Sequence, residues 1–273
     1  MYHHINWHAE DLVTLTPTDF ENHLAILRDK RVQTIFLDEL VQYLTGERRL
    51  CLPTAALTFD DGHLDNWVYA FPLLKKYQMK ATIFVITSWM GHGEVRSYWD
   101  PGDLFMGGLP EILPHSEVKK RAAAGDNSVA LRWGEAEIME GSGLIDIQSH
   151  THLHQDYFLT TEKRNRLDPK TKNLLFEDLA ESKEHIEKSL GNRCRFLCWP
   201  WGKYDEEALA LAKGMGFDAT VTTEKGVNFH GSSIWEIKRI VAKSGDKGWF
   251  SSRMRIYSNR TLGQIYSRIS GIL

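Results

Sequence analysis

Short apolar runs alternate with longer amphipathic stretches along most of the chain. Seven runs are rich in β-branched and aromatic side chains, which is typical of strands. They cover residues 32–37, 55–59, 81–86, 144–149, 195–199, 218–223 and 234–242. Most of them are apolar throughout rather than alternating, and this pattern indicates parallel strands that are buried on both faces.

Three of the stretches between these runs have apolar residues at helical spacing. They cover residues 18–30, 173–191 and 205–217. The first begins at Thr18, and Glu21 follows three residues later, which predicts a capping box. The second ends at Gly191, a typical helix stop. The alternation of strands and helices predicts an α/β fold with a parallel sheet, open or closed into a barrel. No repeat or linker divides the chain, so we expect one domain over residues 1–273.

One long segment, residues 87–133, interrupts the alternation. Its first half is rich in Gly, Trp and Pro, and a basic helical piece follows. The segment leaves the carboxyl end of the strand predicted at 81–86, and in a parallel barrel that end carries the active site. A connection of this length is usually functional or mobile. We therefore expect an excursion over the active-site face that selects the substrate.

The composition shows no marked charge bias. The 273 residues are 42% hydrophobic and 25% charged, with a formal net charge of −3, which is ordinary for a globular protein. This charge predicts no nucleic-acid partner. Nine Trp and nine Tyr suit the faces of sugar rings as well as a hydrophobic core.

The cysteines and the apolar stretches bear on the compartment. Three cysteines, Cys51, Cys194 and Cys198, give no disulfide framework. No stretch reaches the roughly 18 apolar residues of a membrane helix, and no signal peptide is visible. The chain as it stands is therefore expected in the cytoplasm. Its strand-like opening, MYHHINW, equally fits a start downstream of the native one in an extracytoplasmic protein. The oligomeric state is not indicated.

Two adjacent carboxylates, Asp60 and Asp61, follow the run at 55–59 in the stretch LTFDDG. Asp-Gly is a common turn pair, so a plain turn is one interpretation. Like charges at this spacing raise each other's pKa unless a cation lies between them. A metal site or a proton-transfer site is therefore the other interpretation.

Three histidines, His150, His152 and His154, follow the run at 144–149. His150 and His154 can converge on one ion if the chain coils after the strand, whereas His152 could pair with either on an extended strand. Imidazole is a favoured ligand of borderline divalent metals. Two histidines and one carboxylate leave positions for water and substrate, as in catalytic sites. Together the motifs predict that one aspartate binds a metal while the other takes a proton from water.

The motifs TFDDG and HTHLH resemble the first two motifs of the polysaccharide deacetylase family, also called the NodB-homology or carbohydrate esterase 4 family. YHHI, ATIFV and CWPWGKYDEEALALAKGMGF occur in the family's order, so the resemblance covers most of the chain. It is strongest to the subgroup of exopolysaccharide poly-N-acetylglucosamine deacetylases. The resemblance implies a distorted (β/α)7 barrel of parallel strands and the metal-dependent removal of acetyl groups from N-acetylated sugars.

The resemblance also implies roles for the site residues. Asp60 matches the general base and Asp61 a metal ligand. His150 and His154 match the other two ligands, and His152 is a spacer. The implied cofactor is a divalent metal, with zinc as the first choice, while cobalt, nickel or iron suit the same ligands. The expected partner is an N-acetylated sugar polymer or glycoconjugate.

The third motif departs from the family pattern. The family usually has Arg-Pro-Pro-Tyr-Gly or a similar sequence, whereas residues 198–202 read CWPWG. The arginine that orients the base is missing, and Arg239 on another predicted strand is our candidate replacement. The late Asp-x-x-x-Trp pattern is also absent. By the resemblance, the Trp201 backbone N–H serves as an oxyanion donor.

The family's late histidine, the general acid, has no convincing match either. The poly-N-acetylglucosamine subgroup carries this residue near the N-terminus in a Tyr-His pair, and MYHHI fits that pattern. His3 is therefore the candidate acid and His4 the fallback. Only one of the two can face the barrel interior on an alternating strand.

These observations favour a metal-dependent carbohydrate N-deacetylase. Two alternatives stay open. A sugar-binding protein that keeps the fold without turnover is favoured by the missing motif arginine and opposed by the intact aspartate and histidine motifs. A deacetylase or amidohydrolase of a small non-polymeric amide would keep the chemistry and change the substrate.

Overall fold

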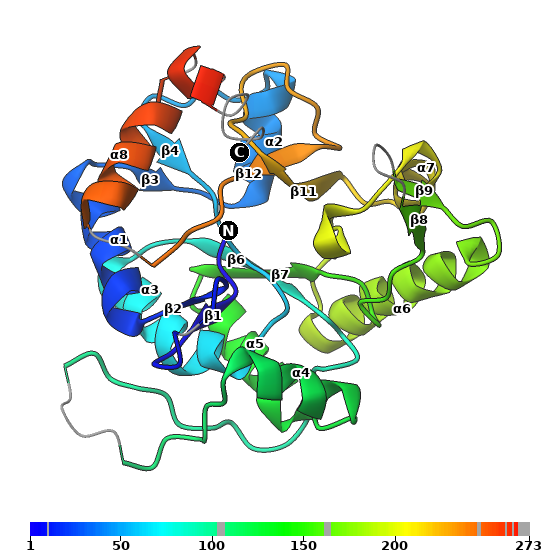
Figure 1. The fold of residues 1–273 in the computed structure, drawn as a ribbon, viewed down its shortest axis with the longest axis horizontal. Helices are drawn as coiled ribbons and strands as arrows, with labels where there is room; N and C mark the ends of the chain where they lie inside the picture. The colour runs from blue at the N-terminus through cyan, green and yellow to red at the C-terminus, as the bar shows by residue number, and fades with distance from the viewer. Residues whose placement is uncertain are drawn as a thin grey trace.

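The computed structural model describes residues 1–9, 11–102, 107–160, 165–244, 247–259, 261–263 and 265–266. A parallel sheet of six strands in the order β12-β11-β10-β7-β6-β5 forms its centre. Helices surround the curled sheet (Figure 1). The strands are β5 (Leu57–Phe59), β6 (Ala81–Val85), β7 (Ile145–Ser149), β10 (Phe196–Cys198), β11 (Ala219–Lys225) and β12 (Ile237–Arg239).

The first two residues bridge the open side of this sheet, between β12 and β5. On one side, Tyr2 N donates to the Thr58 carbonyl at 2.8 Å and Asp60 N donates to the Tyr2 carbonyl at 3.0 Å. On the other side, Ala242 N donates to the Met1 carbonyl at 3.0 Å. The sheet therefore curls into a nearly closed ring, which confirms the expected distorted (β/α) barrel.

Eight α-helices lie within the described residues. They are α1 (Pro17–Asp29), α2 (Leu37–Thr45), α3 (Phe71–Tyr77), α4 (His115–Ala123), α5 (Trp133–Gly141), α6 (Lys172–Leu190), α7 (Glu206–Gly214) and α8 (Lys247–Tyr257). The predicted second and third helices are confirmed as α6 and α7. Helix α1 packs against the barrel where Tyr2 contacts Phe20 and Phe59, each with ring centroids 5.1 Å apart. This aromatic cluster anchors the segment that closes the sheet.

Three short strand pairs complete the structure. Two are parallel, β1 (His4–Ile5) with β2 (Thr14–Leu15) and β3 (Gln33–Thr34) with β4 (Thr54–Ala55), and the third, β8 (Phe158–Thr160) with β9 (Asn165–Leu167), is antiparallel. Among the described residues, no helix combines the length and apolarity needed to cross a membrane.

The predicted start of the first helix is wrong. Helix α1 begins at Pro17, and the Thr16 hydroxyl, not Thr18, accepts the capping hydrogen bond from Asp19 N at 3.0 Å. Proline has a fixed φ suited to the first helical position and needs no partner for an N–H. Pro17 therefore sets the first residue of the helix, and Thr18 lies inside the first turn.

Two of the predicted strands are shorter than expected. The run at 32–37 contributes only β3, because Leu37 already begins α2. Glu39 accepts a hydrogen bond from Phe36 N at 3.1 Å and so stabilises this helix start. The run at 234–242 is strand only over β12. Apolar periodicity alone does not separate short strands from the starts of buried helices.

The excursion expected over residues 87–133 leaves β6 and returns to the barrel through α4 and α5 (Figure 1); its residues 103–106 lie outside the described part. Arg96 anchors it. Its guanidinium contacts both carboxylate oxygens of Glu135 at 2.7 Å and the carbonyls of Ser128 and Ala130 at 2.6 Å. Glu135 is fully buried, so the excursion is tied to the barrel by a buried ion pair.

Candidate active site

The strand register brings the two predicted motifs to one edge of the sheet. Phe59 pairs with Ile83 of β6, and Val85 of the same strand pairs with Ser149 of β7. The aspartates that follow Phe59 and the histidine that follows Ser149 therefore leave the carboxyl ends of neighbouring parallel strands. This is the edge at which α/β barrels place reacting groups.

A tight turn fixes the two aspartates. Asp61 and Gly62 both have left-handed backbone, with φ of 74° and 73°. A Cβ at Gly62 would lie 2.8 Å from the Val85 side chain, so only glycine fits there. Asp60 and Asp61 are buried, with 2% and 8% exposure. The Asp-Gly turn does exist, and it also places two carboxylates in the interior, which a plain surface turn would not.

Asp60 forms a two-point ion pair with Arg239 of β12. Nη1 lies 2.6 Å from Oδ1 and Nη2 lies 2.8 Å from Oδ2, the fork geometry that favours arginine over lysine. Burial by itself raises the pKa of Asp60, but Arg239 and His3 outweigh it and lower that pKa to about 2. Arg239 thus contacts Asp60 in the way expected of a replacement for the missing motif arginine.

Cys198 occupies the position where the family motif has its arginine. Its sulfur lies 3.1 Å from Arg239 Nη2 and 3.8 Å from Asp60 Oδ2. The small buried thiol leaves room for the guanidinium that arrives from β12. A guanidinium from β12 thus contacts the Asp60 carboxylate, while a cysteine stands at the motif position of the family's arginine.

Asp61, His150 and His154 point their donor atoms toward one another. Asp61 Oδ1 lies 3.3 Å from His150 Nε2 and 3.8 Å from His154 Nε2, and all three donor atoms lie within 4.8 Å of one another. His150 Nδ1 donates to the Cys198 carbonyl at 2.8 Å, which leaves the Nε2 lone pair directed at the cluster. This donor set suits a borderline divalent cation.

His152 lies outside this cluster. Its Nδ1 is 2.8 Å from the Thr87 hydroxyl and its Nε2 is 3.2 Å from Glu181. The residue therefore links the second motif to the start of the excursion and to α6.

Backbone strain is concentrated in the same three motifs. Six non-glycine residues in the described chain have left-handed φ, and four of them are Asp61, Thr151, His154 and Trp201. Such conformations cost about 1–3 kcal/mol each and persist where the surrounding structure enforces them. The turns are held in shapes that the local sequence alone does not favour.

The two N-terminal histidines point in different directions. His3 Nε2 lies 3.9 Å from Asp60 Oδ2, and its side chain is 19% exposed; burial lowers its pKa. His4 instead contacts Asp65, with its Nδ1 2.7 Å from Oδ2. Of the two, the structure brings His3 to Asp60.

Trp201 lies on the turn after β10, beside the histidine cluster. Its side chain is 50% exposed, and its ring centroid is 4.4 Å from that of His154. A Cβ at the following Gly202 would lie 2.0 Å from the Thr223 hydroxyl, so the turn requires glycine there. An exposed indole next to two candidate ligands is suited to stacking on a sugar ring.

Comparison with known proteins settles the family. The sequence profile described as polysaccharide deacetylase matches residues 48–220, which include both aspartates, the histidine motif and the Trp201 turn. The chain belongs to the polysaccharide deacetylase family. This confirms the resemblance seen in the motifs. The matched range does not reach His3 or Arg239.

Individual family members are similar over most of this chain. YxkH of Bacillus subtilis (strain 168), itself named as a polysaccharide deacetylase, is 27% identical over 248 residues, 91% of this chain and 72% of that protein. The poly-beta-1,6-N-acetyl-D-glucosamine N-deacetylase of Staphylococcus aureus (strain MSSA476) is 21% identical over 84% of this chain and 67% of its own length. The solved structure of IcaB from Ammonifex degensii superposes with a TM-score of 0.71 at 23% identity, covering 93% and 94% of the two chains, and so shares the fold.

His63 is a further residue of the site that the sequence motifs did not indicate. His63 is buried, and its Nε2 lies 3.1 Å from Asp61 Oδ2, on the carboxylate oxygen that the other two histidines do not contact. Hydrogen bonds from His150 and His63 offset the effect of burial and hold the pKa of Asp61 well below its ordinary value. The position of His63 directly after the DDG turn was the signal available in the sequence.

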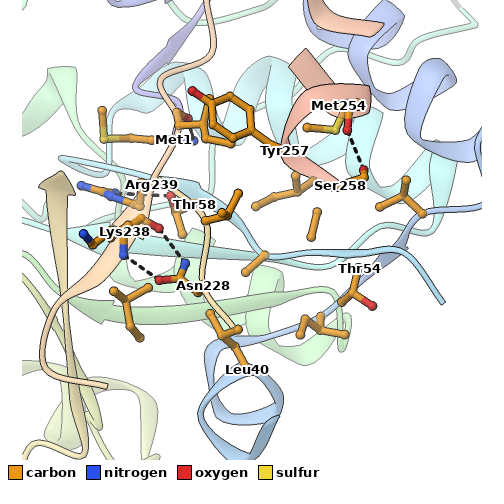
Figure 2. Close-up of a pocket in the computed structure, with 18 of the residues that line it drawn as sticks. Met1, Leu40, Thr54, Thr58, Asn228, Lys238, Arg239, Met254, Tyr257 and Ser258 are labelled. Atoms are coloured by element: carbon orange, nitrogen blue, oxygen red, sulfur yellow. Dashed lines mark hydrogen bonds between the residues drawn. The ribbon is translucent and has the colours of Figure 1, made fainter. Parts of the chain in front are cut away.

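One cavity of the described structure lies away from the metal-ligand cluster. It measures about 650 Å³ and is lined mainly by apolar residues of α2, α8 and the strands around β4. Figure 2 shows Arg239 and Thr58 among the residues that line it. The cavity thus lies beside the ion pair of Asp60 without reaching Asp61, His150 or His154.

Proposed function

We propose that this chain is a metal-dependent carbohydrate N-deacetylase that hydrolyses the acetamide of N-acetylated sugars in a polysaccharide or glycoconjugate. The observation that carries the proposal is the pairing of Asp60 with Arg239 beside the donor cluster of Asp61, His150 and His154. One carboxylate is left for proton transfer while the other completes a ligand set. Zinc is the first candidate metal, and cobalt, nickel and iron suit the same donors.

His154 is the proposed ligand whose surroundings favour the neutral, metal-binding form. Burial and the neighbouring His150 lower the pKa of His154 to about 4, so its imidazole is neutral, as a metal ligand must be. When bound, the cation supplies Lewis acidity that makes water more acidic and an acetyl carbonyl more electrophilic.

Asp60 is placed to act as the general base. Its pKa of about 2 keeps it ionised at neutral pH, and Arg239 fixes the orientation of the carboxylate. Asp60 accepts the proton of the attacking water. The Trp201 backbone N–H donates to the oxygen that becomes negative as the acetyl carbon turns tetrahedral.

His3 is the proposed general acid. The leaving nitrogen of an amide is a poor leaving group until it is protonated. His3 lies 3.9 Å from Asp60, so a proton taken up by the carboxylate stays within reach of the imidazole that delivers it to the sugar nitrogen. The carbon–nitrogen bond then breaks, and acetate and the free amino sugar leave.

Two observations support a sugar polymer as the substrate. The Staphylococcus aureus relative is named for poly-beta-1,6-N-acetyl-D-glucosamine, and Trp201 offers an exposed aromatic face next to His154. The alternative of a sugar-binding protein without turnover was favoured by the missing motif arginine. The contact between Arg239 and Asp60 removes that argument.

The test is acetate release from oligomers of β-1,6-linked N-acetylglucosamine by the zinc-loaded protein. We expect turnover that is lost on chelation and in His154→Ala, and kept in His92→Ala, which changes an exposed histidine of the excursion. A small N-acetylated amide serves as a second substrate. No turnover on either substrate with full metal content would favour the binding protein, and turnover on the small amide alone would favour the small-molecule amidohydrolase.

A further inference from the structure

A second group of histidines lies behind the proposed metal ligands. His4 of β1, His63 after the DDG turn and His115 at the start of α4 place one ring nitrogen each within 4.8 Å of the others. His4 and His63 are each 1% exposed, and their rings stack with centroids 3.6 Å apart. Three imidazoles from three distant parts of the chain are thus gathered at one place, two of them in the interior, and the proposed mechanism uses none of them.

Two buried carboxylates fix the orientation of two of these rings. His4 Nδ1 lies 2.7 Å from Asp65 Oδ2, and His63 Nε2 lies 3.1 Å from Asp61 Oδ2. Each carboxylate accepts the ring N–H, so His4 Nε2 and His63 Nδ1 carry the lone pairs. A carboxylate on the far nitrogen is the usual outer shell of a metal-binding histidine.

The remaining ring nitrogens differ in how they are satisfied. His63 Nδ1 is buried and has no hydrogen-bond partner among the described residues. His4 Nε2 lies 3.0 Å from His115 Nδ1, close to the roughly 3.3 Å that separates two tetrahedral ligands with zinc–nitrogen bonds of about 2.0–2.1 Å. A buried polar atom without a partner is costly; a cation would satisfy His63 Nδ1 and replace the hydrogen bond between His4 and His115.

The surroundings leave room for the adjustment that binding needs. The stacked His4 and His63 rings must tilt apart for both lone pairs to reach one ion. A cavity of about 180 Å³ lies beside them and is lined by both rings, Asp65 and Val118 of α4. His115 is only partly buried, so its ring is the one most free to turn.

We propose that His4, His63 and His115 bind a second divalent transition-metal ion, zinc in the first instance. The ion joins β1, the DDG turn and α4, and so fastens the excursion to the barrel. The two sites are linked through Asp61, because its Oδ1 faces His150 and His154 while its Oδ2 faces His63. The second ion therefore holds the carboxylate of the first site in place.

Zinc stoichiometry tests the proposal without reference to turnover. Metal-free full-length protein is loaded with Zn²⁺, desalted and measured by elemental analysis. We expect two ions per chain in the unaltered protein, one in His115→Ala, one in His154→Ala and none in the double variant. His92→Ala, which removes an exposed histidine of the same excursion, keeps both. One ion in the unaltered protein, or two in His115→Ala, overturns the proposal and leaves a direct His4–His115 hydrogen bond beside a water-filled cavity.

A second measurement separates ligation from folding. In the His154→Ala background, added Zn²⁺ should raise the melting temperature, and the further change His115→Ala should abolish that rise. Asp65→Asn should weaken zinc binding in the same background by about 10–100-fold, as loss of an outer-shell carboxylate typically does, measured by competition with a chromophoric chelator. An unchanged affinity in Asp65→Asn contradicts the assignment. Failure of acetate release would bear on the proposed deacetylation and leave this metal count unaffected.

Discussion

At the scale of single residues, the site depends on how a few buried charges are paired. Asp60 faces a guanidinium, and Asp61 faces imidazoles. The two adjacent carboxylates therefore have different partners although they are neighbours in the chain. In the proposed mechanism, this difference in surroundings suits Asp60 to proton transfer and Asp61 to metal ligation.

Asp60→Asn should keep the metal and lose most of the turnover. An amide cannot accept the proton of water, and loss of a general base typically costs about 10²–10⁴-fold in rate. Acetate release and metal content are measured on the same preparation. Near-normal acetate release from the metal-loaded variant would remove Asp60 from this role.

His3→Ala should impair amide hydrolysis far more than ester hydrolysis. An amine leaves only after protonation, whereas an activated aryl acetate has a good leaving group. The rates of both reactions are compared for the same variant. Equal losses would indicate damage to the fold or the metal site, and an unchanged amide rate would exclude His3 as the acid. His4 would then be an unsuitable fallback, because its ring is engaged with Asp65.

At the scale of elements, strand β7 precedes the proposed ligand His150 and itself carries a carboxyl group that resists ionisation. Asp146 lies on β7 opposite Thr82 of β6, and Gln148 Nε2 donates to it at 2.8 Å. Burial raises the pKa of Asp146 from 3.8 to about 6. The folded protein therefore holds this proton to a higher pH than the unfolded chain does.

This difference predicts how stability changes with pH. The free energy of unfolding should fall by about 1–3 kcal/mol as the pH rises from about 4 to about 6, because only the unfolded state releases the Asp146 proton in that range. Asp146→Asn should remove this fall and make the protein more stable than the unaltered one at pH 7. Denaturant unfolding at several pH values measures the free energy of unfolding of each variant. Asp29→Asn, which changes an exposed carboxylate, is the matched control. Parallel pH profiles for Asp146→Asn and the unaltered protein would contradict the prediction.

At the scale of the whole molecule, a buried ion pair helps to join the excursion to the barrel. Arg96 contacts Glu135 and also the carbonyls of Ser128 and Ala130. Glu135 has no exposure to solvent. Its charge is therefore tolerable only while Arg96 is present.

Arg96→Ala should lower the free energy of unfolding by about 3–5 kcal/mol, since it leaves the buried Glu135 carboxylate without its charged partner. Arg28→Ala, which removes the exposed pair with Asp29, is the control and should leave the free energy of unfolding almost unchanged, because solvent screens an exposed ion pair. Denaturant unfolding compares the two variants. Similar small losses in both would show that the excursion does not depend on this ion pair.

Much of this architecture could be predicted from the sequence. Uninterrupted apolar runs such as residues 81–86 have few alternatives to a buried parallel strand. Polar residues directly after such runs must gather at one edge of the sheet, so Asp60, Asp61, His150 and His154 could be placed together before any coordinates existed. The start of α1 and the extent of β3 were predicted wrongly, because Pro17 sets the helix start and apolar periodicity does not separate a short strand from the start of a buried helix.

What the sequence by itself determined is the order of the strands and helices and the chemistry of the motifs at the strand ends, because both follow from local periodicity and residue type. Only the tertiary structure decided which distant residues meet. Arg239 reaches Asp60 because β12 and the segment of Met1 and Tyr2 close the barrel beside β5. His115 reaches His4 because the excursion folds back onto β1. Such contacts depend on the packing of the whole chain, and no local pattern in the sequence encodes them.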